Sequence, residues 1–68
     1  MSENQKTQRV CNLLLKAIRE TPSGSNIVDM RYDPARNSVV ILWDDAHSVT
    51  AKAADGGLQM VRNIVSSI

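Results

Sequence analysis

The middle of this chain contains an uninterrupted apolar run from Val39 to Trp43. A strand with one exposed face normally alternates apolar and polar side chains, so this run indicates a strand covered on both faces. Val39, Ile41 and Trp43 would share one face, and we expect Trp43 to be buried in the main core. Val40 and Leu42 would share the other face. The run therefore predicts the middle strand of a small sheet, with another layer against each face.

The chain has 68 residues, of which 43% are hydrophobic and 22% are charged. These values are typical of one small globular domain, so we expect a single α+β domain over 1–68, with 1–6 frayed. A domain of about 60 residues buries only ~60% of its unfolded surface and usually needs reinforcement. With Cys11 as the only cysteine and His47 as the only histidine, neither an internal disulfide nor a metal cage is expected. Self-association is the remaining common device.

Charge and hydropathy exclude some partners. Eight Lys and Arg against seven Asp and Glu leave a net charge of +1, which creates no strong field toward nucleic acid or anionic lipid. The first ten residues lack a basic stretch followed by an apolar one, and no run approaches the roughly 18 apolar residues of a membrane span. A single cysteine fits a reducing compartment. We therefore expect a cytoplasmic protein with no membrane partner and no cofactor.

Apolar spacing of three and four predicts a first helix over about 6–20, which Thr21 and Pro22 would end. Its apolar side would consist of Val10, Cys11, Leu14, Ala17 and Ile18, flanked by Leu13 and Leu15.

From Ile27 the period changes to two and predicts an outer strand. Val28, Met30 and Tyr32 would face the core. A turn over 33–37 then leads into the middle strand, because Asp, Pro and Asn each favour turn geometry.

A second tight turn is expected at 44–46, before a weaker third strand over 48–53. Asp55 is a good N-cap for a second helix over about 58–68. The packing face of that helix is expected to be an apolar stripe with spacing of three and four. Its members are Leu58, Val61, Ile64, Val65 and Ile68.

The expected fold is α-β-β-β-α, a three-stranded antiparallel meander with both helices packed on one face. This order resembles the topology of the double-stranded-RNA-binding domain. That family has a Lys-rich cluster at the start of the second helix, where this chain has 55–59 with the sequence DGGLQ. A second family contact, a Gly-Pro-His type loop between the first two strands, is replaced by 33–37. The resemblance therefore implies the topology and not RNA binding in that mode.

The strand sequence VVILWDDAHSVT and the following AADGGLQMVRNIVSSI resemble the C-terminal half of small uncharacterised open reading frames of bacteria and their mobile elements. The resemblance covers roughly the last thirty residues and contains no catalytic motif. It implies a bacterial or phage-like origin and no activity.

Three groups of residues are candidate sites. Asp44, Asp45 and His47 could form a metal site or an acid–base pair, but turn residues explain them better, and His47 is expected on the solvent-facing side of a strand. The glycines at 56–57 could hold an anion at a helix start, but lack a phosphate-loop motif. Cys11 lies on an apolar helix face and is expected to be buried rather than nucleophilic. No catalytic, metal or cofactor residue is therefore predicted.

The remaining candidate is the second face of the sheet. Val40 and Leu42 form an apolar spot there, and polar strand residues surround it, as in a small association surface. The rim residues are Arg31, Thr50 and Lys52, with Asp29 and Ser48. The sequence therefore predicts a non-enzymatic interaction module, a homodimer through this face or through a strand edge beside it. The alternative is a nucleic-acid-binding accessory protein that uses Arg31, Arg36 and Lys52. An enzyme is the third and least favoured class of function.

Overall fold

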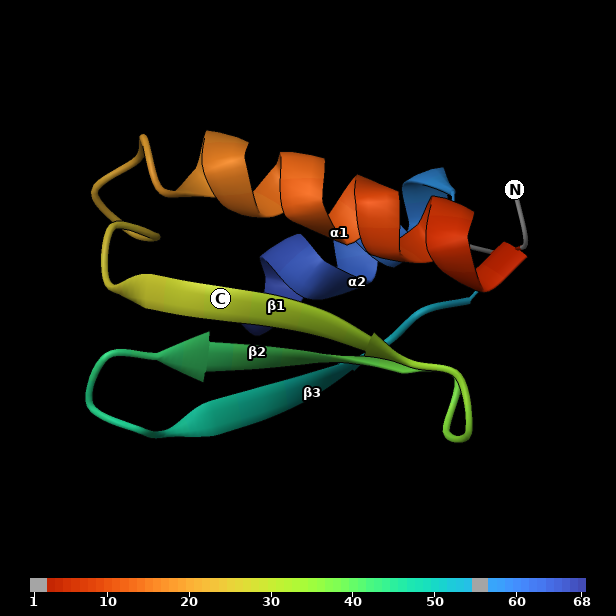
Figure 1. The fold of residues 1–68 in the computed structure, drawn as a ribbon. Coiled ribbons are helices and arrows are strands. Elements are labelled where there is room, and N and C mark those ends of the chain that lie inside the picture. Colours follow the sequence, from red (N-terminus) through yellow and green to blue (C-terminus); the bar gives the residue numbers. More distant parts are fainter. Residues whose placement is uncertain (1–2, 55–56) are drawn as a thin grey trace.

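One helix, three antiparallel strands and a second helix follow one another along the chain (Figure 1), which confirms the predicted α+β class. The computed structural model describes residues 3–54 and 57–68. The strands form one sheet in the order β1-β2-β3, so the expected meander is present. The elements are α1 (Glu3–Ile18), β1 (Ile27–Asp33), β2 (Ser38–Trp43), β3 (Ser48–Lys52) and α2 (Leu58–Ser67).

Both helices lie on the same side of the sheet (Figure 1), α1 mainly against β1 and α2 mainly against β3. The middle strand lies between them and contributes Val39 and Ile41, both fully buried, to the core. Small side chains at Ala51 and Ala53 let α2 approach β3 closely. The core consists of Cys11, Ile27, Met30, Val39, Ile41, Ala51, Ala53, Met60 and Ile64. Within the described residues, the other face of the sheet has no layer against it.

The first helix is displaced toward the N-terminus from its predicted range of 6–20. It begins at Glu3, so the part of the expected frayed segment that the structure describes is helical, and it ends at Ile18. After Ile18 the chain tightens, because the amides of Glu20 and Thr21 bond carbonyls three residues back. The Thr21 hydroxyl also donates to the Ile18 carbonyl at 2.6 Å. The helix therefore ends in a tightened turn ahead of Pro22.

A β-bulge changes the expected orientation of the start of β1. Ile27 pairs with Trp43, but the next pair is Asp29 with Leu42, so Val28 is an extra residue on β1. As a result Ile27 is fully buried, whereas Val28 is 45% exposed. The prediction that Val28 faces the core is therefore wrong. Beyond the bulge the alternation is as predicted, with Met30 buried and Tyr32 packed against the core.

Both hairpin turns lie where they were predicted, and the first has the predicted chemistry. An Asp33 carboxylate oxygen accepts the Ala35 amide at 3.0 Å, and Asn37 has a φ of 48°, in the left-handed region that asparagine tolerates. In the second turn Ala46 has a φ of 72° and its amide bonds the Trp43 carbonyl. A left-handed residue in this place is typical of three-residue hairpin loops. The two turns fix the register of β2 against both neighbours.

Trp43 is only half-buried, so the prediction that it lies within the main core is wrong in part. It packs at the edge of the core, at the end of β2, and its ring stacks on the imidazole of His47 with 4.3 Å between centroids and 13° between planes. His47 precedes β3 and is exposed. The two side chains flank the hairpin loop and meet because the loop brings them to the same face.

The packing face of α2 differs from the predicted stripe. Its buried residues are Met60 and Ile64, while Leu58 is 76% and Val65 is 54% exposed. The N-cap position is Gly57, with no side-chain cap, and the predicted cap Asp55 lies outside the described residues. The helix is therefore rotated about its axis relative to the prediction, and part of its apolar surface lies outside the core.

The bulge can be tested by comparing two neighbouring alanine substitutions. Ile27→Ala should lower the free energy of unfolding by about 2–5 kcal/mol, because it removes buried methyl groups from the core. Val28→Ala should change it by no more than about 0.5 kcal/mol, because Val28 lies outside the core. Urea denaturation of both variants measures the difference. A larger loss of stability for Val28→Ala than for Ile27→Ala would show that β1 has the regular alternation and no bulge.

Candidate interaction surface

Nine side chains form the uncovered face of the sheet, which we call the open face. They lie in three rows across the strands, because each β2 residue is paired with one residue on either side. The centre of the open face is apolar, since Val40 and Leu42 are its aliphatic members. The rows are Asp33, Ser38 and Lys52; Arg31, Val40 and Thr50; and Asp29, Leu42 and Ser48.

All five residues predicted for the interface therefore lie on this one face. Arg31, Val40 and Thr50 share the middle row, Leu42 is the next apolar residue along β2, and Lys52 is in the outer row. Val40 and Leu42 are half-buried by their polar neighbours, although no helix or strand of residues 3–54 and 57–68 packs above them. An apolar centre with a polar rim is the usual composition of an association surface.

Charged side chains on β1 form one wall of the open face. The Asp29 carboxylate accepts the Met30 amide at 2.9 Å with one oxygen and the Arg31 Nε at 2.5 Å with the other. The Arg31 side chain is 79% exposed, so this pair contributes little to stability. A shallow hollow of about 290 Å³ lies beside it, lined by Asp29, Arg31, Val40, Leu42 and Ser48. The pair thus places charged groups beside an apolar floor.

Side chains from the helices occupy backbone groups at both edges of the sheet, two on β1 and one at the end of β3. On β1, the Gln8 amide group donates to the Met30 carbonyl at 3.2 Å and accepts the Tyr32 amide at 2.9 Å. On β3, Asn63 of α2 donates to the Lys52 carbonyl at 3.1 Å. Side chains that occupy backbone groups of an edge strand hinder pairing with a second chain. Sequence reasoning missed these two residues, because an edge contact of this kind leaves no periodic signal.

The acidic turn is organised around Asp45. Its Oδ1 accepts the backbone amide of His47 at 3.1 Å and lies 2.6 Å from the His47 Nδ1. The backbone and side-chain hydrogen bonds from His47 lower the pKa of Asp45 below its usual value of 3.8. Among the described residues, no group of three His, Cys, Asp or Glu could hold a metal ion. The geometry is that of a hairpin turn closed by an aspartate–histidine pair.

Cys11 is buried, as predicted, in the core between the helices and the sheet. Burial raises the pKa of its thiol to about 11. A thiol with this pKa is almost entirely protonated near neutral pH and is a poor nucleophile. Cys11 therefore acts as a small apolar core residue.

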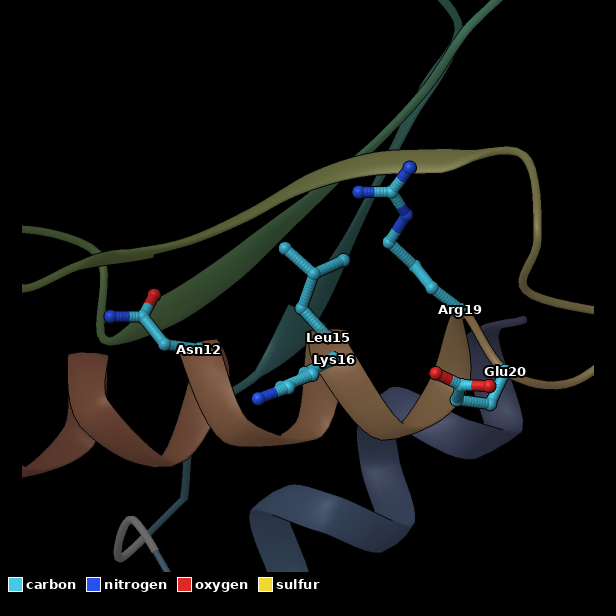
Figure 2. A pocket seen from close by; sticks show the side chains of 5 residues that line it. All are labelled: Asn12, Leu15, Lys16, Arg19 and Glu20. Carbon is cyan, nitrogen blue, oxygen red and sulfur yellow. The ribbon is translucent and has the colours of Figure 1, made fainter.

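A second hollow, of about 430 Å³, lies along the C-terminal half of α1 (Figure 2). Leu15 of α1 and Arg19, just after the end of α1, extend toward β1, and Asn12, Lys16 and Glu20 complete the lining. Its charged groups have both signs, and it contains no histidine or cysteine. The lining therefore combines one aliphatic side chain with an amide and charged groups.

A third hollow, of about 370 Å³, lies between the C-terminal ends of the helices and is lined by Ile18, Thr21, Ser23, Val65 and Ile68. Together with the exposed Leu58, it is the second apolar surface that the fold leaves uncovered. Sequence reasoning assigned these α2 residues to the core. The sequence does contain an indication of the buried stripe. Met60 lies four residues before Ile64, so the two share one face of the helix.

Comparisons of the chain with protein-family models, with curated proteins and with solved structures found no match. The resemblance to bacterial and mobile-element reading frames therefore stays a prediction. Neither described helix combines the length and apolar character needed to cross a membrane. The glycine-rich entry to α2 falls partly outside the described residues, at 55–56.

The Asp45 contact predicts a particular dependence of stability on pH. Because its pKa is lowered by folding, Asp45 contributes stability above its unfolded pKa and loses it as the pH falls through the folded pKa. Asp45→Asn should therefore melt below wild type at neutral pH, and the difference should vanish on acidification. Melting temperatures across the acid range measure it, with Asp44→Asn as the control. A difference that stays constant with pH would contradict the assignment.

The Cys11 thiol should react with a thiol reagent only when the protein unfolds. We expect the native protein to be labelled far more slowly than the urea-unfolded protein, because the thiol is buried and its pKa is about 11. Mass spectrometry of samples quenched over time gives both rates. Equal rates in native and unfolded protein would show that α1 does not cover this position.

Proposed function

We propose that this chain is a non-enzymatic interaction module that forms a twofold homodimer through the open face. The observation that carries the proposal is the apolar centre of that face, Val40 and Leu42, on a strand whose other side is fully occupied by the core. An antiparallel strand with one face exposed to solvent would be expected to carry polar residues on that face. A second copy would bury this centre and add the reinforcement that a 68-residue chain needs.

Occupied backbone groups at the strand edges, above all at β1, favour the face over a strand edge as the contact. Gln8 occupies two backbone groups of β1, and Asn63 occupies the last carbonyl of β3. Addition of a partner strand along β1, or at the Lys52 end of β3, would require these hydrogen bonds to break. Packing of sheet on sheet requires no such change, and sheets stacked in this way lie roughly 10 Å apart.

We further propose a cytoplasmic location and a bacterial or mobile-element origin. The lone buried Cys11 supports a reducing compartment, and the C-terminal resemblance supports the origin. The absence of a convergent polar set in the described hollows supports a role without catalysis.

Nucleic-acid binding has less support than self-association. Of the three basic residues considered for it, Arg31 lies beside Asp29, and the Arg36 Nε is 3.9 Å from an Asp33 oxygen. These carboxylates would repel a phosphate backbone at the same place, and the net charge of the chain is only +1. Lys52 alone does not make a basic patch.

The homodimer is tested by placing a charge at its centre. Leu42→Lys should give a folded monomer, because each added ammonium group would face its own copy across the twofold axis. We expect the dissociation constant to rise by roughly 30-fold or more, while the free energy of unfolding changes by about 1 kcal/mol or less. Light scattering over a wide concentration range gives the molar mass, and circular dichroism confirms folding.

Val65→Lys is the matched control, because it adds the same charge to the second exposed apolar surface, on α2. It should leave the dimer intact. A monomeric wild type would overturn the homodimer, and dissociation by Val65→Lys but not by Leu42→Lys would move the interface to the helices. Salt-dependent binding of a labelled oligonucleotide, lost in Lys52→Ala, would favour the alternative function.

A further inference from the structure

The charges on the open face are distributed so that one twofold arrangement suits them better than the others. Asp33 and Lys52 stand at opposite ends of the same row, with Ser38 between them. Arg31 and Asp29 pair with one another along β1. The β1 side of the face therefore carries both aspartates, and the β3 side carries the lysine.

We propose that the twofold axis of the dimer runs along β2, so that β1 of each copy lies over β3 of the other. This arrangement, which rests on the proposed function, places Asp33 over Lys52 of the partner subunit, twice in each dimer. Val40 and Leu42 then each meet their own copy at the centre. The remaining β1 charges face the hydroxyl-bearing strand, Arg31 over Thr50 of the partner subunit and Asp29 over Ser48 of the partner subunit. Every charge meets an opposite charge or a hydroxyl group.

An axis across the strands gives poorer contacts. If it passes through the row of Val40, Arg31 lies over its own copy and Asp29 lies over Asp33 of the partner subunit, so like charges meet. If it passes between Val40 and Leu42, Asp29 lies over Arg31 of the partner subunit, but these two groups already neutralise one another within each chain. In that case Asp33 and Lys52 lie beyond each other's reach. Only the axis along β2 joins this pair.

Asp33 and Lys52 are suitably held for the contact. One Asp33 oxygen is fixed by the Ala35 amide at 3.0 Å, while the other is 3.9 Å from the Arg36 Nε and can accept a second cation. Lys52 is exposed, and its backbone is anchored by Asn63. The long lysine side chain can cross the roughly 10 Å between stacked sheets to reach a carboxylate on the facing strand.

The test is a double-mutant cycle on the dimer dissociation constant, measured by analytical ultracentrifugation. Asp33→Asn removes the charge but keeps the oxygen that accepts the Ala35 amide, so the turn is preserved. In the wild-type background it should weaken the dimer by roughly 2- to 30-fold, because two rim ion pairs are lost. In a Lys52→Asp background, where Asp33 would face an added aspartate, the same substitution should strengthen the dimer. This reversal of sign is the expected result.

Equal effects of Asp33→Asn in both backgrounds would overturn the axis along β2, since the two residues would then not face each other. Strengthening in both backgrounds would indicate the axis through Val40, and no effect in either would indicate the axis between Val40 and Leu42. Melting curves of the same variants, recorded at dilutions where each is monomeric, measure any coupling between Asp33 and Lys52 within one chain. That coupling is thereby distinguished from coupling between chains. A wild type that is monomeric, or a dimer that survives Leu42→Lys, would instead show that the proposed function itself fails.

Discussion

The packing of both helices on the same face of the sheet is the constraint on which the rest of the structure depends. The buried side chains of α1, α2 and all three strands meet in one layer, with Val39 and Ile41 at its centre. Helices packed on a sheet in this way bury one face only, and the residues that the structure describes form no third layer. Val40 and Leu42 are thus left without cover by the same arrangement that buries their neighbours on β2. The open face is a consequence of how the core is built.

A bulge in β1 and side-chain contacts at the sheet edges adapt the three strands to the two helices above them. The bulge at Val28 turns Ile27 into the core and lets Asp29 reach the open face beside Leu42. At the sheet edges Gln8 and Asn63 connect each helix to its strand through backbone groups. These contacts connect the helices to the sheet and hinder strand addition, above all along β1. The open face and the exposed side of α2 carry the uncovered apolar residues.

Much of the fold could be predicted from sequence, because period and turn chemistry are local signals. The strand order, the hairpin turns and the class follow from the run at 39–43 and from Asp33 and Asn37. The bulge could not be predicted, since period-two alternation contains no mark for an extra residue. The face of α2 was mistaken because two apolar stripes coexist on it, and only packing against β3 selects the one with Met60 and Ile64. The five interface residues share a face because the alternation holds on β2, on β3 and on β1 past the bulge.

The central claim is that the open face meets a second copy of itself. The most direct measurement is an isotope-filtered nuclear Overhauser experiment on a mixture of labelled and unlabelled protein, which detects only contacts between chains. We expect intermolecular contacts from the methyl groups of Val40 and Leu42 to the same residues of the partner subunit. Intermolecular contacts confined to Leu58 and Val65, or none at a concentration where wild type is fully folded, would contradict the account.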